Sequence, residues 1–333
     1  MSGIFNSKLD SILAGTSRSF YLSLKELPKS IRPQISLLYM LARTSDTIAD
    51  SEKGAADERL RALESYIQFS QGITESSPDL ISLSELQENK SEAALLMSVS
   101  EIVSKIADFS ESDQKEIRRC LGVIISGQIL DLQRFSSNSG RISSLAVDDE
   151  LDDYAYRVAG SVGEFWTRMS LNHLFSFNEG DKESELFDHG IRFGKALQMI
   201  NILRDIPADL ALGRCYIPST RLEESNLVPE DLLDHNRMED FRPLYNEYLD
   251  LTDEYFASAT NYIEMIPHSQ FRLRGSCMLP VIIGRKTISA LRDNNVLDPE
   301  HRIKIDRSEI KEVVKKVVLA VPFRGSSKKI LRE

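Results

Sequence analysis

The chain has 333 residues, a formal net charge of −10 and a pI near 5.2. This length is ample for a substantial hydrophobic core, and the acidic balance argues against a nucleic-acid partner, whose phosphates need a basic surface. The three cysteines are far apart and lack metal-ligand spacing, which favours structural thiols in a reduced, cytoplasmic setting over a disulfide framework.

Neither the N-terminus nor any apolar run indicates a membrane-spanning or secreted protein. The first residues lack the continuous apolar segment of a signal peptide, and the longest apolar runs are well short of the roughly 20 residues that cross a bilayer. We therefore expect a soluble protein with at most a peripheral membrane contact, and a monomer is a plausible state.

Helical periodicity runs through almost every segment, so the predicted class is all-α. No composition break requires two domains, and we expect one domain over residues 1–333. Within it, the Ser and Gly cluster opening 136–150 predicts a loop or lid, and 301–333 is a basic amphipathic segment. For that segment a packed terminal helix with solvated lysines is favoured over membrane attachment. The histidines lack the E-x-x-H spacing of a di-iron bundle.

The first segment that carries chemistry is a helix predicted from Ser30 to about Asp50, with Pro33 tolerated in its first turn. It is apolar on most faces, which indicates a central helix whose single polar stripe lines a cavity. The alternative is that the aspartates of the stripe lie on a solvated face. The stripe consists of Tyr39, Arg43, Asp46 and Asp50.

Further helices are predicted near 55–71, 92–108 and 112–135. In the last of these, Gln128 and Asp131 are three residues apart, so they could face a cavity, form a buried polar pair or lie on a surface turn.

The segment from Asp152 has an acidic start suited to a helix N-terminus. Gly160, Ser161 and Gly163 then interrupt its apolar positions, which indicates close packing or room for a bulky ligand. Tyr154 on the same segment could be a core tyrosine or line a site.

A turn is predicted at 178–185, and residues 194–218 then carry a second polar stripe at helical spacing. A row of carboxylates and amides without His or Cys suits Mg²⁺, which takes part of its ligands from substrate phosphates, so the stripe suggests a diphosphate substrate. Pro207 should end or kink the helix near Ile206 and change the direction of the last aspartate. The stripe consists of Gln198, Asn201, Asp205 and Asp209.

Two acidic motifs on separate helices, about 155 residues apart, make each other more credible as metal-binding motifs. Five sequence blocks, in this order along the chain, resemble the squalene and phytoene synthase family. The resemblance covers about residues 16 to 284 and leans to bacterial squalene synthases. The blocks are TSRSF, YMLARTSDTIAD, YAYRVAGSVG, QMINILRDIPADLALGRCYIP and SCMLPVIIG.

The resemblance implies an isoprenoid synthase fold, with the two acidic motifs facing each other across a central cavity. Family members join two prenyl diphosphates head to head. More than one Mg²⁺ ion would bridge the diphosphates and stabilise the leaving group. The implied metal ligands are Asp46, Asp50, Asn201, Asp205 and Asp209.

The resemblance also implies roles in catalysis and substrate binding. The candidate catalytic residues are Tyr39, Arg43 and Tyr154. Arginine is expected on the diphosphate side, because its planar fork suits phosphate oxygens. The candidate substrate-binding residues are Arg18, Ser19, Phe20, Gln198, Asn201, Arg204 and Arg214.

NADPH stays open as a second cofactor, because squalene synthases bind it without a glycine-rich fingerprint. The cofactor segment of squalene synthases, K-I-R-K, resembles residues 304–307 here, but Asp306 stands at a basic position. The candidates for cofactor contacts are Arg18, Arg43, Arg204 and Lys304.

The resemblance favours the route through presqualene diphosphate to squalene. The runner-up products are presqualene diphosphate, dehydrosqualene or hydroxysqualene, and phytoene from twenty-carbon substrates. A non-catalytic assembly factor of the same fold would have lost its aspartates. Two departures from the family pattern are Ala49, where a third acidic residue is common, and Pro207 in the second motif.

Overall fold

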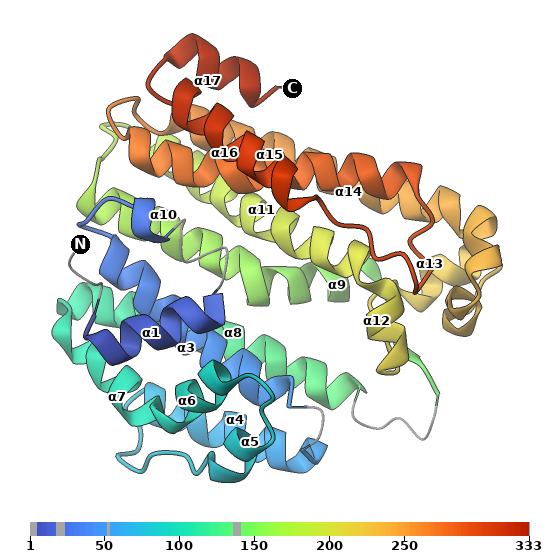
Figure 1. Cartoon of the computed structure of the whole chain (residues 1–333), viewed down its shortest axis with the longest axis horizontal. Helices are drawn as coiled ribbons and strands as arrows, with labels where there is room; N and C mark the ends of the chain where they lie inside the picture. The colour runs from blue at the N-terminus through green and yellow to red at the C-terminus, as the bar shows by residue number, and fades with distance from the viewer. Residues whose placement is uncertain (1–4, 18–23, 52–53, 136–140, 333) are drawn as a thin grey trace. The chain divides into compact units, whose positions relative to one another are not determined.

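The computed structural model describes residues 5–17, 24–51, 54–135 and 141–332 (Figure 1). It confirms the all-α class, since the described residues contain only one pair of two-residue strands besides helices and turns. The chain divides into two compact units. Unit 1 is Met1–Ser136 with Phe165–Ser176, and unit 2 is Ser137–Glu164 with Phe177–Glu333. The single-domain organisation over 1–333 stays a prediction.

Unit 1 is built around α3, which packs against α4, α6 and α8. The predicted helix over 92–108 is wrong in its continuity, because three short helical pieces cover that range. The helices of unit 1 are α1 (Ser7–Ser17), α3 (Arg32–Ala49), α4 (Ala56–Ser70), α5 (Ile81–Glu85), α6 (Lys90–Met97), α7 (Val99–Ser104) with a 3-10 turn Lys105–Asp108, and α8 (Glu111–Phe135), joined by the later part of α10.

The α3 helix begins and ends as its sequence predicts. Pro33 lies in its first turn, where a missing backbone donor costs nothing. At its other end the backbone N–H of Asp50 donates to the carbonyl of Asp46 at 2.8 Å. The buried hydroxyl of Tyr66 donates to the carbonyl of Leu41 at 3.0 Å and ties α4 to the middle of α3.

Unit 2 is organised on α11, which packs along α14, and α14 in turn packs on α15, as Figure 1 shows. Its helices are α9 (Asp148–Ala155), a π-helical turn Tyr156–Gly160, the start of α10 (Ser161–His173), α11 (Gly180–Arg204), α12 (Ile206–Ala211), α13 (Ser219–Glu224), 3-10 turns at Pro229–Leu233 and His235–Arg237, α14 (Met238–Met265), α15 (Phe271–Asp293), α16 (Arg307–Ala320) and α17 (Arg324–Ile330).

The turn predicted at 178–185 is wrong in most of its length, because α11 already begins at Gly180. Its first turn holds Asp181 and Glu183, and acidic side chains there favour a helix start by interacting with the exposed N–H groups. The helix has 25 residues and runs from this acidic start to the residue before Asp205 of the second acidic motif.

Glycines bring the helices of unit 2 into backbone contact. A Cβ on Gly194 would lie 2.1 Å from the carbonyl oxygen of Ala159, and one on Gly163 would lie 1.9 Å from the carbonyl oxygen of Gly190. Neither position has room for a methyl group. The sequence predicted either close packing or room for a bulky ligand at the glycine-rich stretch. At Gly163 the structure shows close packing.

A short parallel ladder joins the second half of the predicted lid to the residues that follow α12. The strands β1 (Ser143–Ser144) and β2 (Arg214–Cys215) pair in register. Of the expected lid, residues 136–140 lie outside the described part of the chain, and 148–150 belong to α9. A lid function for 136–150 stays a prediction.

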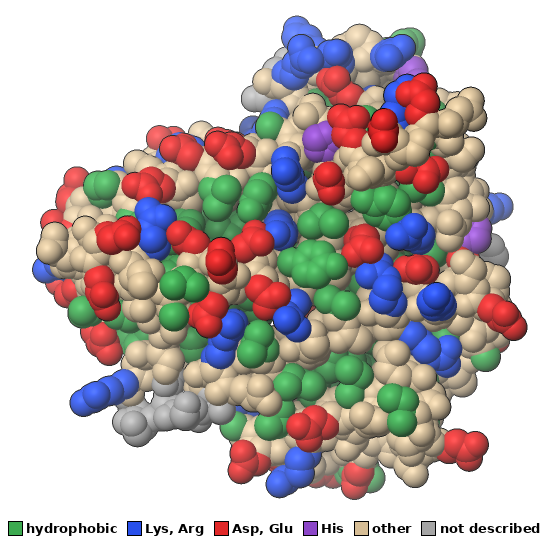
Figure 2. Space-filling model, turned by 180° about the vertical axis from the view of Figure 1, so that it is seen from behind, with side chains coloured by type: hydrophobic (Ala, Val, Ile, Leu, Met, Phe, Trp, Pro, Cys, Tyr) green, Lys and Arg blue, Asp and Glu red, His purple; other side chains and the backbone are tan. Residues whose placement is uncertain are grey.

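The surface carries mixed charges. On the face drawn in Figure 2, Asp and Glu side chains are interspersed with Lys and Arg and with apolar side chains. No helix in the described part of the chain combines the length and the apolar character that crossing a bilayer requires.

Candidate active site

The predicted stripe on α3 is the partly exposed side of an otherwise buried helix. Between Leu37 and Ala49, the positions that are not buried are the stripe residues Tyr39, Arg43 and Asp46, together with Ala42. Asp50 follows at the exposed end of the helix. The 3.6-residue period therefore predicted correctly which side chains point away from the core of unit 1.

Asp46 is held by a partner from α8. Gln128 Nε2 donates to Asp46 Oδ1 at 2.5 Å, and the Gln128 side chain is itself buried. Burial and the nearby charge of Asp50 raise the pKa of Asp46 to about 7, against the opposing effects of Arg43 and Gln128. A carboxylate destabilised in this way gains from a neighbouring cation, which a freely solvated aspartate would not need. The solvated-face reading of this stripe therefore does not describe Asp46.

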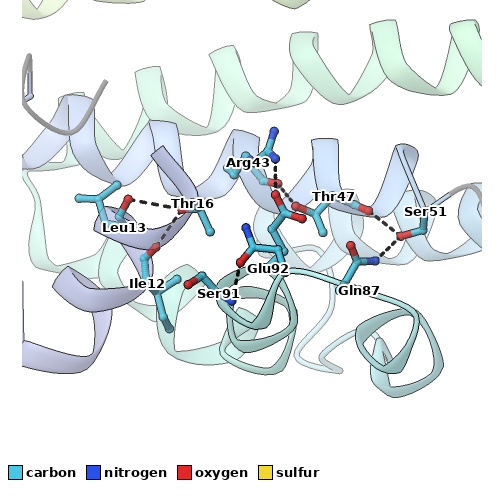
Figure 3. Close-up of polar contacts among 10 residues, drawn as sticks. Ile12, Leu13, Thr16, Arg43, Thr47, Ser51, Gln87, Ser91 and Glu92 are labelled. Carbon is cyan, nitrogen blue, oxygen red and sulfur yellow. Dashed lines mark hydrogen bonds and ion pairs between the residues drawn. The ribbon is translucent and has the colours of Figure 1, made fainter. Parts of the chain in front are cut away.

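Arg43 forms an ion pair with Glu92 of α6, with Nη2 and Oε1 2.5 Å apart (Figure 3). Both side chains are mostly shielded, with 30% and 20% of their surface exposed. Burial acts to lower the pKa of Arg43, but the bond with Glu92 and the charge of Asp46 outweigh it, so the pKa is raised. Arg43 is thus a fixed, permanent cation one helical turn from Asp46.

Tyr39 is the first residue of the stripe. Burial raises the pKa of its phenol above the ordinary value, so the group stays protonated at neutral pH. A neutral phenol can donate a hydrogen bond or present its ring face to a cation.

The second acidic motif lies in unit 2 where α11 ends and α12 begins. Asp205 adopts a non-helical backbone (φ −99°, ψ 14°) between the two helices, and Pro207 occupies the first turn of α12. The predicted break near Ile206 is confirmed. Asp209 therefore belongs to a separate helix, α12, although its backbone N–H still donates to the carbonyl of Asp205 at 3.0 Å.

Asp205 is clasped by two guanidinium groups. Arg204 donates from Nε to Oδ1 at 2.9 Å and from Nη2 to Oδ2 at 2.6 Å, while Arg302 donates from Nη2 to Oδ1 at 2.8 Å. Burial acts to raise the pKa of Asp205, but these bonds outweigh it and hold the pKa below its ordinary value. Arg204 Nη2 also donates to Asn201 Oδ1 at 3.2 Å, so three of the predicted residues share one network.

Arg214 and Tyr154 lie around the ladder that follows α12. Gly213, at φ 75°, makes the turn that leads into Arg214, which lines a small pocket together with Asp209 and Tyr216. The ring of Tyr216 stacks on that of Tyr154 with centroids 5.0 Å apart, and its hydroxyl donates to the Tyr154 hydroxyl at 3.4 Å. Tyr154 is thus half-buried beside the second motif rather than part of the hydrophobic core.

The remaining predicted residues are less constrained. Gln198 is half-buried on α11, and Lys304 is exposed and forms no ion pair with another described residue. Arg18, Ser19 and Phe20 lie outside the described residues.

Sequence reasoning missed four residues that hold the predicted site side chains. The sequence did indicate that Gln128 could face a cavity, which was one of the alternatives for the Gln128 and Asp131 pair. Tyr216 lies inside one of the five blocks that resemble the family. Glu92 and Arg302 carry no such indication, because their contacts connect residues 49 and 97 positions apart. The four are Glu92, Gln128, Tyr216 and Arg302.

The donor chemistry of both motifs fits Mg²⁺ that arrives with a diphosphate. Among the described residues, no three His, Cys, Asp or Glu side chains converge into a group that could hold a metal ion alone. Each motif offers carboxylate oxygens, the second with the Asn201 amide, and no sulfur or imidazole. Mg²⁺ accepts such incomplete oxygen sets because waters and substrate phosphates complete its octahedron.

The family model for squalene/phytoene synthases matches residues 13–309. The chain belongs to the squalene/phytoene synthase family. A bifunctional lycopene cyclase/phytoene synthase from Arthroderma gypseum is 25% identical over 307 residues, covering 90% of this chain and 49% of the fungal protein. A presqualene diphosphate synthase from Zymomonas mobilis is 29% identical over 224 residues, covering 67% of this chain and 63% of that protein. The family member described here thus spans less than half the length of such fungal relatives.

The solved structures place this family member in the isoprenoid synthase fold. A ligand complex of TcSQS superposes with a TM-score of 0.75 at 18% identity and covers 98% of this chain and 89% of that one. The fold implied by the sequence motifs is confirmed.

Proposed function

We propose that this chain joins two farnesyl diphosphates head to head in a magnesium-dependent reaction that passes through presqualene diphosphate to squalene. The observation that carries the proposal is the α3 stripe. There the buried Gln128 amide donates to Asp46, and Arg43, held by Glu92, lies one helical turn away. The pKa of Asp46 is raised to about 7. Groups with perturbed pKa values cluster at functional sites.

In this proposal each acidic motif holds magnesium through its own residues. Asp46 and Asp50 serve the first motif, and Asp205, Asp209 and Asn201 serve the second. Bound Mg²⁺ supplies charge neutralisation for the departing diphosphate. The aspartates would hold the ion through oxygens that are already positioned, since Gln128 and Arg204 each bond one carboxylate of a motif.

The arginines are proposed to hold the diphosphate oxygens. Arg43 is anchored by Glu92, so its guanidinium loses little freedom on binding an anion. Arg204 and Arg214 are proposed to bind diphosphate oxygens beside the second motif. Arg18 and Ser19 are assigned to this role by the family motif alone.

The proposed reaction is a head-to-head coupling. The carbon–oxygen bond of the first substrate breaks, and both electrons leave with the diphosphate. The double bond of the second substrate attacks the allylic cation, and loss of one proton closes the cyclopropyl ring of presqualene diphosphate. Tyr39 and Tyr154 are proposed to line the cation's path with neutral phenol rings, which stabilise positive charge without trapping it. Water must be excluded, because it would capture the cation as an alcohol.

The final product separates the alternatives. Squalene requires a second ionisation and a hydride, for which Lys304 is the proposed NADPH contact. A reaction that stops early would resemble that of the Zymomonas mobilis relative, and a twenty-carbon substrate would resemble the phytoene synthase relatives. A non-catalytic assembly factor is disfavoured by the presence of all four motif aspartates.

Product analysis tests the proposal. The purified chain is incubated with Mg²⁺ and either farnesyl or geranylgeranyl diphosphate, with and without NADPH, and the products are identified by mass spectrometry. We expect squalene from farnesyl diphosphate with NADPH and presqualene diphosphate without it. Phytoene, or presqualene diphosphate under both conditions, would select an alternative product. No coupled product from either substrate would refute the enzyme assignment.

A further inference from the structure

The helix α9, which carries Tyr154, buries little apolar surface. Only two of its eight side chains, Leu151 and Ala155, are buried. A helix of this length is marginally stable in water on its own, and two buried side chains do not fix its position. The polar contacts of α9 with its neighbours in unit 2 therefore decide where the ring of Tyr154 lies.

Two aspartates one helical turn apart on α9 bond two tyrosines that are two turns apart on α14. The Tyr248 hydroxyl donates to Asp148 Oδ1 at 2.6 Å, and Arg221 bonds the other oxygen of this carboxylate at 3.0 Å. The Tyr255 hydroxyl donates to Asp152 Oδ1 at 3.2 Å. Burial and the charge of Asp152 raise the pKa of Tyr255 to about 12, so this phenol keeps the proton that it donates. The helix is thus bonded to α14 at two points.

Lys195 of α11 completes the second of these contacts. Its Nζ lies 2.7 Å from both carboxylate oxygens of Asp152 and 5.9 Å from the centroid of the Tyr156 ring. The Lys195 side chain is only 13% exposed, whereas Lys182 on the same helix exposes 51% of its side chain in its pair with Glu179. A shielded ammonium that bonds both oxygens is held in one geometry, which an exposed lysine is not.

The chain after α9 is held by the same turn of α11. The π-helical turn Tyr156–Gly160 follows α9 directly, and its Ala159 carbonyl packs against Gly194, the residue before Lys195. Turns of this kind are rare and occur frequently at functional sites. One turn of α11 therefore contacts both the carboxylate that precedes Tyr154 and the backbone that follows it.

We propose that Lys195 is a positioning residue that acts through Asp152 to fix the place of the Tyr154 ring. Asp152 lies two residues before Tyr154, so a shift of its carboxylate moves the backbone that carries the ring. That ring stacks on Tyr216 with centroids 5.0 Å apart, and a displacement of α9 changes this stack. The role in turnover rests on the proposed coupling reaction, in which the Tyr154 ring lines the path of the cation. A misplacement of about 1 Å in such a group can lower a rate by up to about a hundredfold.

The place of the Tyr154 ring can be measured without any substrate. The full chain is labelled with 3-fluorotyrosine, and the fluorine resonance of Tyr154 is assigned by its loss in Tyr154→Phe. We expect Lys195→Met to shift this resonance by more than its line width, and Lys195→Arg, which keeps the cation, to return it toward the wild-type position. The matched control is Lys182→Met, which removes an exposed lysine of the same helix and should leave the resonance unmoved. An unmoved Tyr154 resonance in Lys195→Met would overturn the proposal, whether or not the chain forms a coupled product.

A kinetic cycle tests whether the effect of Lys195 runs through Tyr154. With farnesyl diphosphate and Mg²⁺, Lys195→Met should lower kcat about tenfold and change KM less than about twofold, because the contacts that bind the substrate remain. In the Tyr154→Ala background the same substitution should lower kcat less than about twofold, since the ring that it positions is gone. Circular dichroism checks that each variant is folded.

A tenfold loss of kcat in both backgrounds, or an equal loss in Lys182→Met, would overturn the proposal. A shifted fluorine resonance together with a wild-type chain that forms no coupled product would refute the coupling reaction instead, and would support Lys195 as the residue that positions Tyr154.

Discussion

Arg302 donates from Nε and Nη2 to Oδ1 of Asp205, at 3.1 and 2.8 Å. The guanidinium comes from the segment that leads into α16, 97 positions further along the chain. It occupies an oxygen that the proposed reaction assigns to magnesium. The Arg302 side chain is 65% exposed, so the pair contributes at most about 1 kcal/mol and a divalent ion can displace it.

Arg302→Ala should lower the Mg²⁺ concentration needed for half-maximal activity by about two- to fivefold. The reason is that the variant removes a cation that competes for Asp205, and about 1 kcal/mol corresponds to roughly a fivefold change in an equilibrium constant. Lys311→Ala removes a positive charge at an exposed position of α16, outside residues 304–307, and serves as the control. Magnesium titration of initial rates gives the answer. A higher magnesium requirement in Arg302→Ala would mean that the arginine assists the ion instead of competing with it.

Gln128→Leu should weaken productive magnesium binding about 10- to 100-fold. Gln128 holds Oδ1 of Asp46 at 2.5 Å, and residues that orient a metal ligand typically contribute this much to affinity. The measurement is the magnesium dependence of kcat/KM. Gln114→Leu, at the half-buried start of the same helix, is the comparison. If kcat/KM depends on magnesium equally in both variants, Gln128 does not position a metal ligand and only packs between the helices.

The pair of Arg43 and Glu92 should show a coupling energy of about 1 kcal/mol in a double-mutant cycle. Its two side chains are mostly shielded, whereas the pair of Lys8 and Glu101 exposes 60% and 34% of its side chains at a similar distance. Denaturant unfolding of Arg43→Met, Glu92→Gln and the double variant measures the coupling. A cycle on Lys8 and Glu101 should give a smaller value. Additive effects at Arg43 and Glu92 would show that the ion pair does not stabilise unit 1.

Gly194→Ala should destabilise the protein by about 2 kcal/mol or more, although alanine is the better helix former. The added methyl group would lie 2.1 Å from the carbonyl oxygen of Ala159, so α11 would have to move away from the π-helical turn. Gly180→Ala is the matched control on the same helix, because nothing lies within 4 Å of its added methyl group. Thermal unfolding compares the two. Similar melting temperatures for both variants would contradict the close packing.

The sequence predicted those parts of the site that depend on local geometry. The α3 stripe was correct because the period of one helix decides which side chains share a face. The break before Pro207 was correct because the missing donor and the ring clash act within one turn. The acidic start of α11 carried a readable helix signal that the turn prediction over 178–185 overlooked.

Long-range partners could not be predicted in this way. Nothing near Asp46 in the sequence indicates that Gln128 will meet it, because 82 residues separate them and packing alone brings α3 and α8 together. The same holds for Arg302 and Asp205. The helical breaks within 92–108 also escaped prediction, since they depend on how short helices pack around α3.

The most direct test of the central claim, that both acidic motifs drive prenyl coupling, is the rate of coupled product formation by Asp46→Asn and Asp205→Asn. The controls are Asp57→Asn and Asp181→Asn, which change exposed aspartates outside the motifs. Each motif variant should lose at least about a hundredfold in rate with its circular dichroism spectrum unchanged, because an amide cannot replace the charge of a metal ligand. Both controls should keep wild-type rates. Full turnover by either folded motif variant would contradict the account.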